Sequence, residues 1–158
     1  DFISVNPCNL YGPGDKVHPL KGHVVAALIY KFWKAKRENL PTVECFGDGS
    51  PKREFLYVDD LADGLVHLLG VDDPPDWVNL GTGKDQTILE LAGMVKDTVG
   101  FKGSISHDLS KPDGTPVKRL DVTLMNSLGW RASIDLRSGI PNAYEDFLST
   151  LASGTARL

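Results

Sequence analysis

The sequence predicts an α/β fold, in which short strands alternate with amphipathic helices. Apolar runs bounded by turn residues alternate along the chain with segments whose apolar residues recur at helical spacing. The first apolar run, residues 2–5, leads into a polar, glycine-rich segment with no helical lead-in. With 158 residues, 41% of them hydrophobic and 24% charged, the chain can bury one substantial core.

The opening strand over residues 2–5 is expected to be buried and to end at Asn6-Pro7. Residues 11–14 read Tyr-Gly-Pro-Gly, which is typical of a turn with special backbone angles. In an open α/β sheet, ligands bind outside the carboxyl ends of the strands. Unless this segment is a plain surface loop, four of its polar side chains are expected to face a ligand: Asn9, Tyr11, His18 and His23.

The first helix is expected to follow His23 directly. Its apolar residues recur at helical spacing, at Val25, Ile29, Phe32 and Trp33. Basic residues in its last turn, up to Arg37, complement the helix dipole. Beyond Pro41, the sequence predicts a short strand over residues 43–46 and a turn over residues 47–51.

The next unit is a strand over residues 53–58 followed by a helix to about Leu69. Asp59 and Asp60 lie side by side before the apolar part of this helix. Two adjacent carboxylates could form a catalytic pair, but an aspartate ahead of a helix commonly accepts backbone N–H bonds as its N-cap. Asp59 or Asp60 is therefore expected to cap the helix.

The second half of the chain repeats the alternation of strand and helix. A strand over residues 77–80 precedes Gly81-Thr82-Gly83, which we expect to form a tight strand-to-helix turn. Thr87 and Glu90 have the spacing of a capping box, and Gly100 ends that helix. The remaining expected elements are a strand over 104–107, a loop over 111–116, a short helix over 124–128, a helix over 136–151 that is irregular at Pro141, and a frayed tail over 152–158.

Charge and composition exclude several classes of function. A formal net charge of −4 argues against a nucleic-acid-binding or anionic membrane surface, so we expect neither partner. The sequence shows no signal segment and no apolar run long enough to span a bilayer, which favours a cytoplasmic location. Cys8 and Cys45 lack CxxC spacing and are expected to be free thiols, and no histidine spacing indicates a metal site.

Two kinds of side chain could carry chemistry. Arg53 follows a glycine-rich turn at the start of a strand, where its planar guanidinium can bind a phosphate. The other candidate cations are Lys31, Lys34, Lys111, Lys118 and Arg119, which could equally be solvated surface charges. His23 stands between a glycine and a helix, and a histidine can exchange protons near neutral pH.

The chain is expected to be part of a longer protein. It begins at Asp1, and its opening strand has no partner unit before it, although parallel strands come in βαβ units. The glycine-rich fingerprint of a dinucleotide-binding turn is not found, because Gly81-Thr82-Gly83 has no third glycine at Gln86.

Four segments, taken together, resemble the GDP-L-fucose synthase family of extended short-chain dehydrogenases. They read NPCNLYGPGDKVHPLKGHVVAAL from Asn6, FGDGSPKREFLYVDDLADGLVHLL from Phe46, VNLGTGKDQTILELA from Val78 and KPDGTPVKRLDV from Lys111. The resemblance covers practically the whole chain and corresponds to the C-terminal half of such an enzyme. It implies late Rossmann strands plus a small α/β substrate-binding domain, interleaved over residues 1–158, with the glycine-rich N-terminal half absent.

The resemblance implies an activity and a set of site residues. The activity is epimerisation of GDP-4-keto-6-deoxy-D-mannose at C3 and C5, followed by NADPH-dependent reduction of the C4 ketone. His23 falls on the family's general acid, which also lies against NADP(H). The residues implied at the nicotinamide end are Pro7, Cys8, Asn9 and Leu10. The residues implied to bind the GDP-sugar are Lys31, Phe46, Arg53, Asp113 and Lys118.

The resemblance also implies a homodimer, and it leaves two alternatives open. One is an epimerase or dehydratase of the same superfamily that acts on another nucleotide sugar. The other is a non-catalytic module that binds nucleotide sugars. The chain alone is expected to be inactive, because a dinucleotide site needs the phosphate-binding first βα turn.

Overall fold

A computed structural model describes residues 2–157 and shows eight strands and five helices in that range. The elements are β1 Ser4–Pro7, β2 Asn9–Tyr11, α1 Val24–Arg37, β3 Thr42–Phe46, β4 Lys52–Tyr57, α2 Val58–Leu69, β5 Trp77–Leu80, β6 Asp85–Thr87, α3 Ile88–Val99, β7 Ser104–Asp108, β8 Val117–Lys118, α4 Thr123–Ser127 and α5 Leu136–Ala152. The alternation of strand and helix confirms the predicted α/β class.

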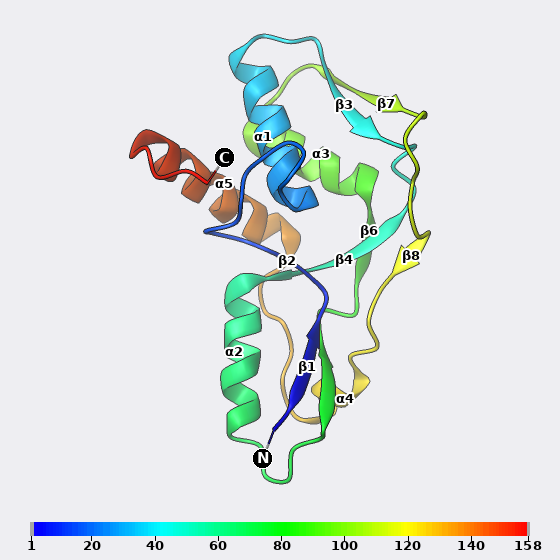
Figure 1. The fold of residues 1–158 in the computed structure, drawn as a ribbon, viewed down its shortest axis with the longest axis vertical. Helices are drawn as coiled ribbons and strands as arrows, with labels where there is room; N and C mark the ends of the chain where they lie inside the picture. Colours follow the sequence, from blue (N-terminus) through cyan, green and yellow to red (C-terminus); the bar gives the residue numbers. More distant parts are fainter. Residues whose placement is uncertain (1, 158) are drawn as a thin grey trace.

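Three small sheets are arranged along an elongated molecule (Figure 1). β1 pairs with β5 in parallel at one end, and β3 pairs with β7 in parallel at the other. Between them, β4 pairs in parallel with β2 and β8 and antiparallel with β6. In Figure 1, β4 crosses the middle of the molecule, with α1, α3 and α5 above it and α2, β1 and β5 below.

The molecule has two hydrophobic cores, one on each side of β4. The upper core is built mainly by α1, α3 and α5, and the lower core contains side chains from α2, β5 and α4. Successive side chains of a strand point to opposite faces. Phe55 and Tyr57 therefore enter the upper core, whereas Leu56 between them enters the lower one.

Three of the predicted helix ends follow local signals in the sequence. Thr87 and Glu90 form the capping box, with the Glu90 N–H donating to Thr87 Oγ1 at 3.0 Å and the Thr87 N–H donating to Glu90 Oε2 at 2.8 Å. Gly100 closes α3 in the left-handed conformation with φ of 73°. α1 begins directly after His23, as its apolar spacing predicts.

The expected cap of α2 is wrong. Tyr57 is the N-cap residue and makes no side-chain capping bond, because α2 begins where β4 ends and Asp59 and Asp60 already lie in its first turn. Asp60 is buried and accepts hydrogen bonds from the Ser133 N–H, the Ser133 hydroxyl and the Ile134 N–H. Its carboxylate therefore fastens the segment that leads into α5.

The first strand differs from its prediction in burial and extent. β1 includes Asn6 and Pro7, and three of its four residues are exposed, because within residues 2–157 it pairs on one side only, with β5. β2, β6 and β8 lie where no strand was predicted. The Gly81-Thr82-Gly83 turn leads into β6 before α3, and the predicted strand-to-helix turn is thus corrected.

The C-terminal region also differs from its prediction. α5 runs through Pro141 without interruption. The tail folds back onto the segment after β2, where the Val17 N–H donates to the Arg157 carbonyl at 2.8 Å and Arg157 Nη1 donates to the Gly14 carbonyl at 3.0 Å. As far as residue 157, the tail is therefore anchored where fraying was expected.

Candidate functional site

The candidate site residues fall into two groups at opposite ends of β4. The first, the histidine hollow, has a volume of about 180 Å³ and is lined by Leu10, Tyr11, residues 12–14, Asp15, His23 and Val58. The second, the basic cluster, consists of Lys31, Phe46, Arg53, Asp113 and Lys118. Val58 directly follows the end of β4, whereas Arg53 lies at its start.

His23 stands at the rim of the histidine hollow and reaches solvent. It is the N-cap residue of α1, and its side chain is 77% exposed. Its Nδ1 lies 3.2 Å from Oδ1 of Asp15, whose side chain is only 16% exposed. When Nδ1 donates to this carboxylate, Nε2 is the ring nitrogen left for proton exchange.

The segment that carries Asp15 is fixed by several backbone contacts. Gly14 adopts φ of 78°, and its N–H donates to Asp146 Oδ2 at 2.9 Å. A Cβ at Gly12 would lie 2.7 Å from Cγ1 of Val58, so the chain here approaches the start of α2 too closely for a side chain. Together with the anchoring of the tail, these contacts hold Asp15 beside His23.

Two other expected candidates in this segment serve the fold. Tyr11 is buried and donates its hydroxyl to the Asp135 carbonyl at 3.2 Å, and burial raises its pKa. His18 accepts the N–H groups of Leu20 and Lys21 on its Nδ1, both at 3.0 Å. Both side chains are therefore engaged by neighbouring backbone.

Residues 7–10 run from the end of β1 into β2, and none of them is an acidic or basic residue. The Cys8 N–H donates to the Leu80 carbonyl at 3.2 Å, and the Asn9 amide donates to the Glu54 carbonyl at 2.7 Å. Leu10 packs against the lower core and also lines the histidine hollow. Burial, and then the nearby Glu54 charge, raise the pKa of the Cys8 thiol to about 12.

Cys8 is expected to resist alkylation in the folded protein, because the thiolate is the reactive form. With a pKa near 12, about one thiol in ten thousand is ionised at pH 8, against roughly a quarter for an ordinary cysteine. Iodoacetamide should modify Cys8 at least about a hundredfold more slowly in the folded full-length protein than in urea, measured by peptide mass spectrometry. Equal rates in the two states would contradict the buried, neutral thiol.

In the basic cluster, Lys31 and Phe46 lie together at its α1 side. Lys31 Nζ lies 4.4 Å from the centre of the Phe46 ring and donates to the Glu44 carbonyl at 3.0 Å. Phe46 is the last residue of β3 and is 46% exposed, so its aromatic side chain is accessible to a planar ligand. A cation beside an aromatic ring can accompany a stacked base.

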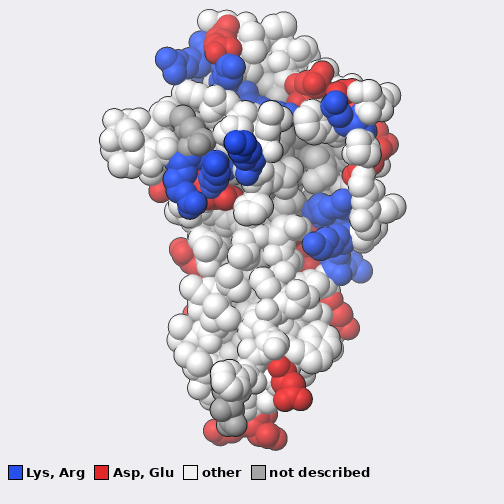
Figure 2. Space-filling model, viewed as in Figure 1, with Lys and Arg blue, Asp and Glu red and all other residues white. Residues whose placement is uncertain are grey.

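Arg53 and Lys118 are neighbours on two paired strands. β4 and β8 run in parallel, and their register places Arg53 opposite Lys118. Arg53 Nη1 donates to the Thr115 carbonyl at 2.5 Å and to the Lys52 carbonyl at 2.8 Å. Figure 2 shows Lys and Arg side chains gathered over the region of β4 and β8. These positive charges can bind a phosphate group.

Asp113 connects the exposed loop over residues 111–116 to the turn after β3. Its Oδ1 accepts the Asp48 N–H at 2.7 Å, and a Cβ at Gly47 would overlap its carboxylate. Gly47, with φ of 66°, is therefore required for this close approach. The contact holds the loop across the cluster, between Phe46 and Arg53.

Two further residues, Asp15 and Glu54, orient the site although no sequence motif predicts them. Asp15 faces His23 from eight positions upstream, a spacing that no local pattern marks. Glu54 is fully buried next to Arg53. The signal for Glu54 was a charged residue two positions before Leu56, and therefore on the same strand face, directly before the apolar residues 55–57.

Across residues 2–157, no three His, Cys, Asp or Glu side chains are grouped so that they could hold a metal ion. None of the helices in the described part of the chain is long and apolar enough to cross a membrane.

The chain belongs to the NAD dependent epimerase/dehydratase family, whose family model matches residues 1–81. It is 46% identical over 153 residues to GDP-L-fucose synthase 1 of Arabidopsis thaliana, covering 97% of this chain and 47% of that protein. It is 45% identical over 157 residues to GDP-L-fucose synthase of Escherichia coli K12, covering 94% of this chain and 49% of that protein. The chain thus spans about half the length of the curated relatives it matches.

A solved structure agrees in fold with the described chain. The structure of a GDP-L-fucose synthetase from Naegleria fowleri superimposes with a TM-score of 0.91 at 29% identity, covering 99% of this chain and 48% of that one. A second structure of that protein, bound to NADP, gives a TM-score of 0.89. These likenesses confirm the predicted fold class, a part of an extended short-chain dehydrogenase.

Proposed function

We propose that this chain is the C-terminal half of an NADP-dependent GDP-L-fucose synthase. The proposed reaction is 3,5-epimerisation of GDP-4-keto-6-deoxy-D-mannose, then reduction of its C4 ketone. The observation that carries the proposal is the placement of a histidine paired with a carboxylate and of a cluster of cations at opposite ends of one strand. Identities of 45–46% to GDP-L-fucose synthases over nearly the whole chain select the substrate.

The basic cluster is the proposed site for the GDP part of the substrate. Arg53 and Lys118 supply adjacent positive charges for the diphosphate. The exposed aromatic side chain of Phe46 can stack on the guanine, with the Lys31 ammonium against the Phe46 ring. Asp113 holds the loop over residues 111–116 between Phe46 and Arg53. Asp113 itself lies at the nucleotide end of the proposed site.

The histidine hollow is the proposed site for the sugar. Tyr57 lies four positions after Arg53, which is about 13 Å along an extended strand, so an elongated ligand can reach from one group to the other. The C4 carbonyl of the sugar acidifies C3 and C5, and each epimerisation removes one proton and returns one to the opposite face. His23 is the proposed acid, giving its proton through Nε2 while Asp15 stabilises the imidazolium.

The segment from Pro7 to Leu10 suits the nicotinamide end of NADP(H), which supplies a hydride to the C4 ketone when bound. Pro7 and Leu10 are apolar, and the raised pKa of Cys8 keeps this side chain neutral. A neutral surface next to His23 lets ring and sugar approach each other without a competing charge. Asn9 contributes by fixing this segment to β4 through its bond to the Glu54 carbonyl.

We further propose that the preceding half of the enzyme packs against the lower end of this chain. A two-stranded parallel sheet such as β1 with β5 is normally part of a larger sheet that is covered on both faces. Apolar side chains stand exposed here, among them Phe2, Val66, Leu69 and Trp77. Figure 2 shows no Lys or Arg over this lower part.

We also propose that the full-length protein is a cytoplasmic homodimer. The free thiols Cys8 and Cys45 suit a reducing compartment.

The decisive test is the activity of the full-length protein. With GDP-4-keto-6-deoxy-D-mannose and NADPH, we expect NADPH consumption and a product identified as GDP-L-fucose by nuclear magnetic resonance. The matched UDP- and dTDP-4-keto-6-deoxy sugars should be turned over at least about a hundredfold less efficiently, because the nucleotide would be mispositioned. A non-catalytic module would bind the GDP-sugar without consuming NADPH, and that result would refute the proposal.

A second candidate substrate is a related GDP-sugar. The chain is 38% identical over 144 residues to GDP-L-colitose synthase of Yersinia pseudotuberculosis. Comparing GDP-4-keto-6-deoxy-D-mannose with the corresponding 3-deoxy sugar in the same assay distinguishes the two.

A further inference from the structure

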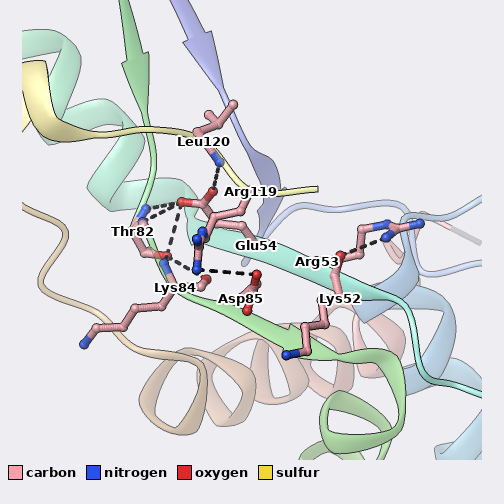
Figure 3. A network of polar contacts seen from close by, with 9 residues as sticks. Lys52, Arg53, Glu54, Thr82, Lys84, Asp85, Arg119 and Leu120 are labelled. Atoms are coloured by element: carbon pink, nitrogen blue, oxygen red, sulfur yellow. Dashed lines mark hydrogen bonds and ion pairs between the residues drawn. The ribbon is translucent and has the colours of Figure 1, made fainter. Parts of the chain in front are cut away.

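Glu54 is a buried carboxylate that joins three segments distant in the sequence (Figure 3). Its Oε1 accepts the Thr82 N–H at 2.6 Å and the Gly83 N–H at 2.7 Å, and also contacts the Thr82 hydroxyl at 3.3 Å. Its Oε2 accepts the Leu120 N–H at 2.7 Å. No ion pair to Glu54 is found within residues 2–157, so backbone donors satisfy its charge.

The Leu120 contact is the buried end of an otherwise exposed segment. Residues 111–119 are all exposed, and β8 itself contains only two residues. The other contacts on this segment lie at or near the surface, such as Arg119 with Asp85 at 3.8 Å. The bond from Leu120 to Glu54 therefore fixes the point from which the segment returns into the fold.

This bond lies next to the two cations of the proposed diphosphate site. Arg53 directly precedes Glu54, and Lys118 lies two residues before Leu120. The pairing of β4 with β8 places Arg53 opposite Lys118. The hydrogen bond from the Leu120 N–H to the Glu54 carboxylate holds the two segments in this register just beyond that pair. Any shift of the 117–120 segment would move Lys118 relative to Arg53.

We propose that Glu54 is a positioning residue, which holds the 117–120 segment against β4 so that Lys118 and Arg53 can bind one diphosphate together. The inference rests on the proposed function and adds to it a residue that does not touch the substrate. Glu54 acts through the segment it anchors.

A carboxylate is needed because donors approach both of its oxygens. Glutamine has the same shape but only one acceptor oxygen. With that oxygen toward Thr82 and Gly83, which offer the larger number of donors, its NH₂ group would face the Leu120 N–H. Space is tight on the Thr82 side, since a Cβ at Gly81 would lie 3.1 Å from Cδ of Glu54. Glu54→Gln should therefore release the 117–120 segment selectively.

The experiment compares Glu54→Gln with Asp60→Asn in the full-length enzyme. Asp60 is an equally suitable buried carboxylate that accepts backbone N–H groups, but it anchors residues 133 and 134. By hydrogen exchange with mass spectrometry, Glu54→Gln should speed exchange in peptides covering 117–121 by roughly tenfold, the scale of one lost buried hydrogen bond, and leave 82–84 nearly unchanged. Asp60→Asn should leave the exchange of 117–121 unchanged.

Steady-state kinetics test whether the contact between Glu54 and Leu120 affects binding of the GDP-sugar. Glu54→Gln should raise KM for the GDP-sugar roughly tenfold with kcat within about twofold, whereas Asp60→Asn should lower Tm without changing KM. In a double-mutant cycle, Glu54→Gln should add little to the KM of Lys118→Met, because both changes remove the same contact. Should Glu54→Gln fail to fold, Glu54→Asp, which keeps the charge but is one methylene shorter, takes its place in the same comparison.

Unchanged exchange over 117–121 would overturn the proposal whatever the substrate is. Faster exchange with an unchanged KM, or fully additive effects of Glu54→Gln and Lys118→Met, would overturn the link to the diphosphate. Failure of the proposed function is a separate result, because the unmodified enzyme would then not turn over the GDP-sugar, whatever the exchange of residues 117–121 in the variants.

Discussion

Replacing His23 with glutamine in the full-length enzyme is expected to slow epimerisation by between about a hundredfold and several thousandfold, the contribution of one general acid. The exposed imidazole makes one side-chain contact of note, with Asp15, so the fold should survive the change. NADPH binding should be retained. In D₂O the unmodified enzyme should place deuterium at both C3 and C5 of the product, which nuclear magnetic resonance measures directly. The variant should incorporate it slowly and yield some reduced sugar that is not fully epimerised.

His67→Gln is the matched control for this experiment. His67 lies on α2 and contacts the Leu128 carbonyl at 2.8 Å, far in the fold from the histidine hollow. Its replacement should leave deuterium incorporation at both carbons unchanged. Normal double incorporation at a normal rate in His23→Gln would remove His23 from the chemistry and leave it as the residue that begins α1.

The second large effect is expected at Arg53. Arg53→Met keeps the aliphatic stem but removes the charge, and a hydrogen bond to a charged group contributes about 1.5–3 kcal/mol. KM for the GDP-sugar should therefore rise about tenfold or more, while kcat changes little. Steady-state kinetics at several GDP-sugar concentrations measure both constants.

Arg137→Met provides the comparison for Arg53→Met. Arg137 is an exposed arginine on α5 and lies outside the basic cluster, so its replacement should leave KM unchanged. If Arg53→Met folds with an unchanged KM, Arg53 does not contact the substrate, and the basic cluster is not the diphosphate site.

The elements that the sequence predicted well are those whose signals are local. The Thr87 and Glu90 capping box, the left-handed Gly100 and the apolar spacing after His23 each depend on a few neighbouring residues, and the structure confirms all three. β2 and β8, by contrast, contain three and two residues and exist through pairing with β4. No periodicity can develop over so few residues, so nothing in the sequence could mark them.

The same distinction applies to the site. His23 and Arg53 could be chosen from their own chemistry and their positions beside predicted turns, and their roles stay predictions. The partners that orient the site are set by tertiary contacts. Asp15 reaches His23 because the chain turns at Gly12 and Gly14. Asp60 was predicted as a possible helix cap, because its contacts with residues 133 and 134 lie more than seventy positions away in the sequence.

The position of β4 between the two cores has a consequence for how the protein unfolds. Phe55 and Tyr57 belong to one core and Leu56 to the other, so neither core can lose this strand without exposing the apolar residues of both. Local unfolding of either half is therefore expected to be coupled to the other, so that the molecule unfolds as one cooperative unit in spite of its elongated shape. The strand that joins the ends of the proposed site also prevents those ends from opening independently.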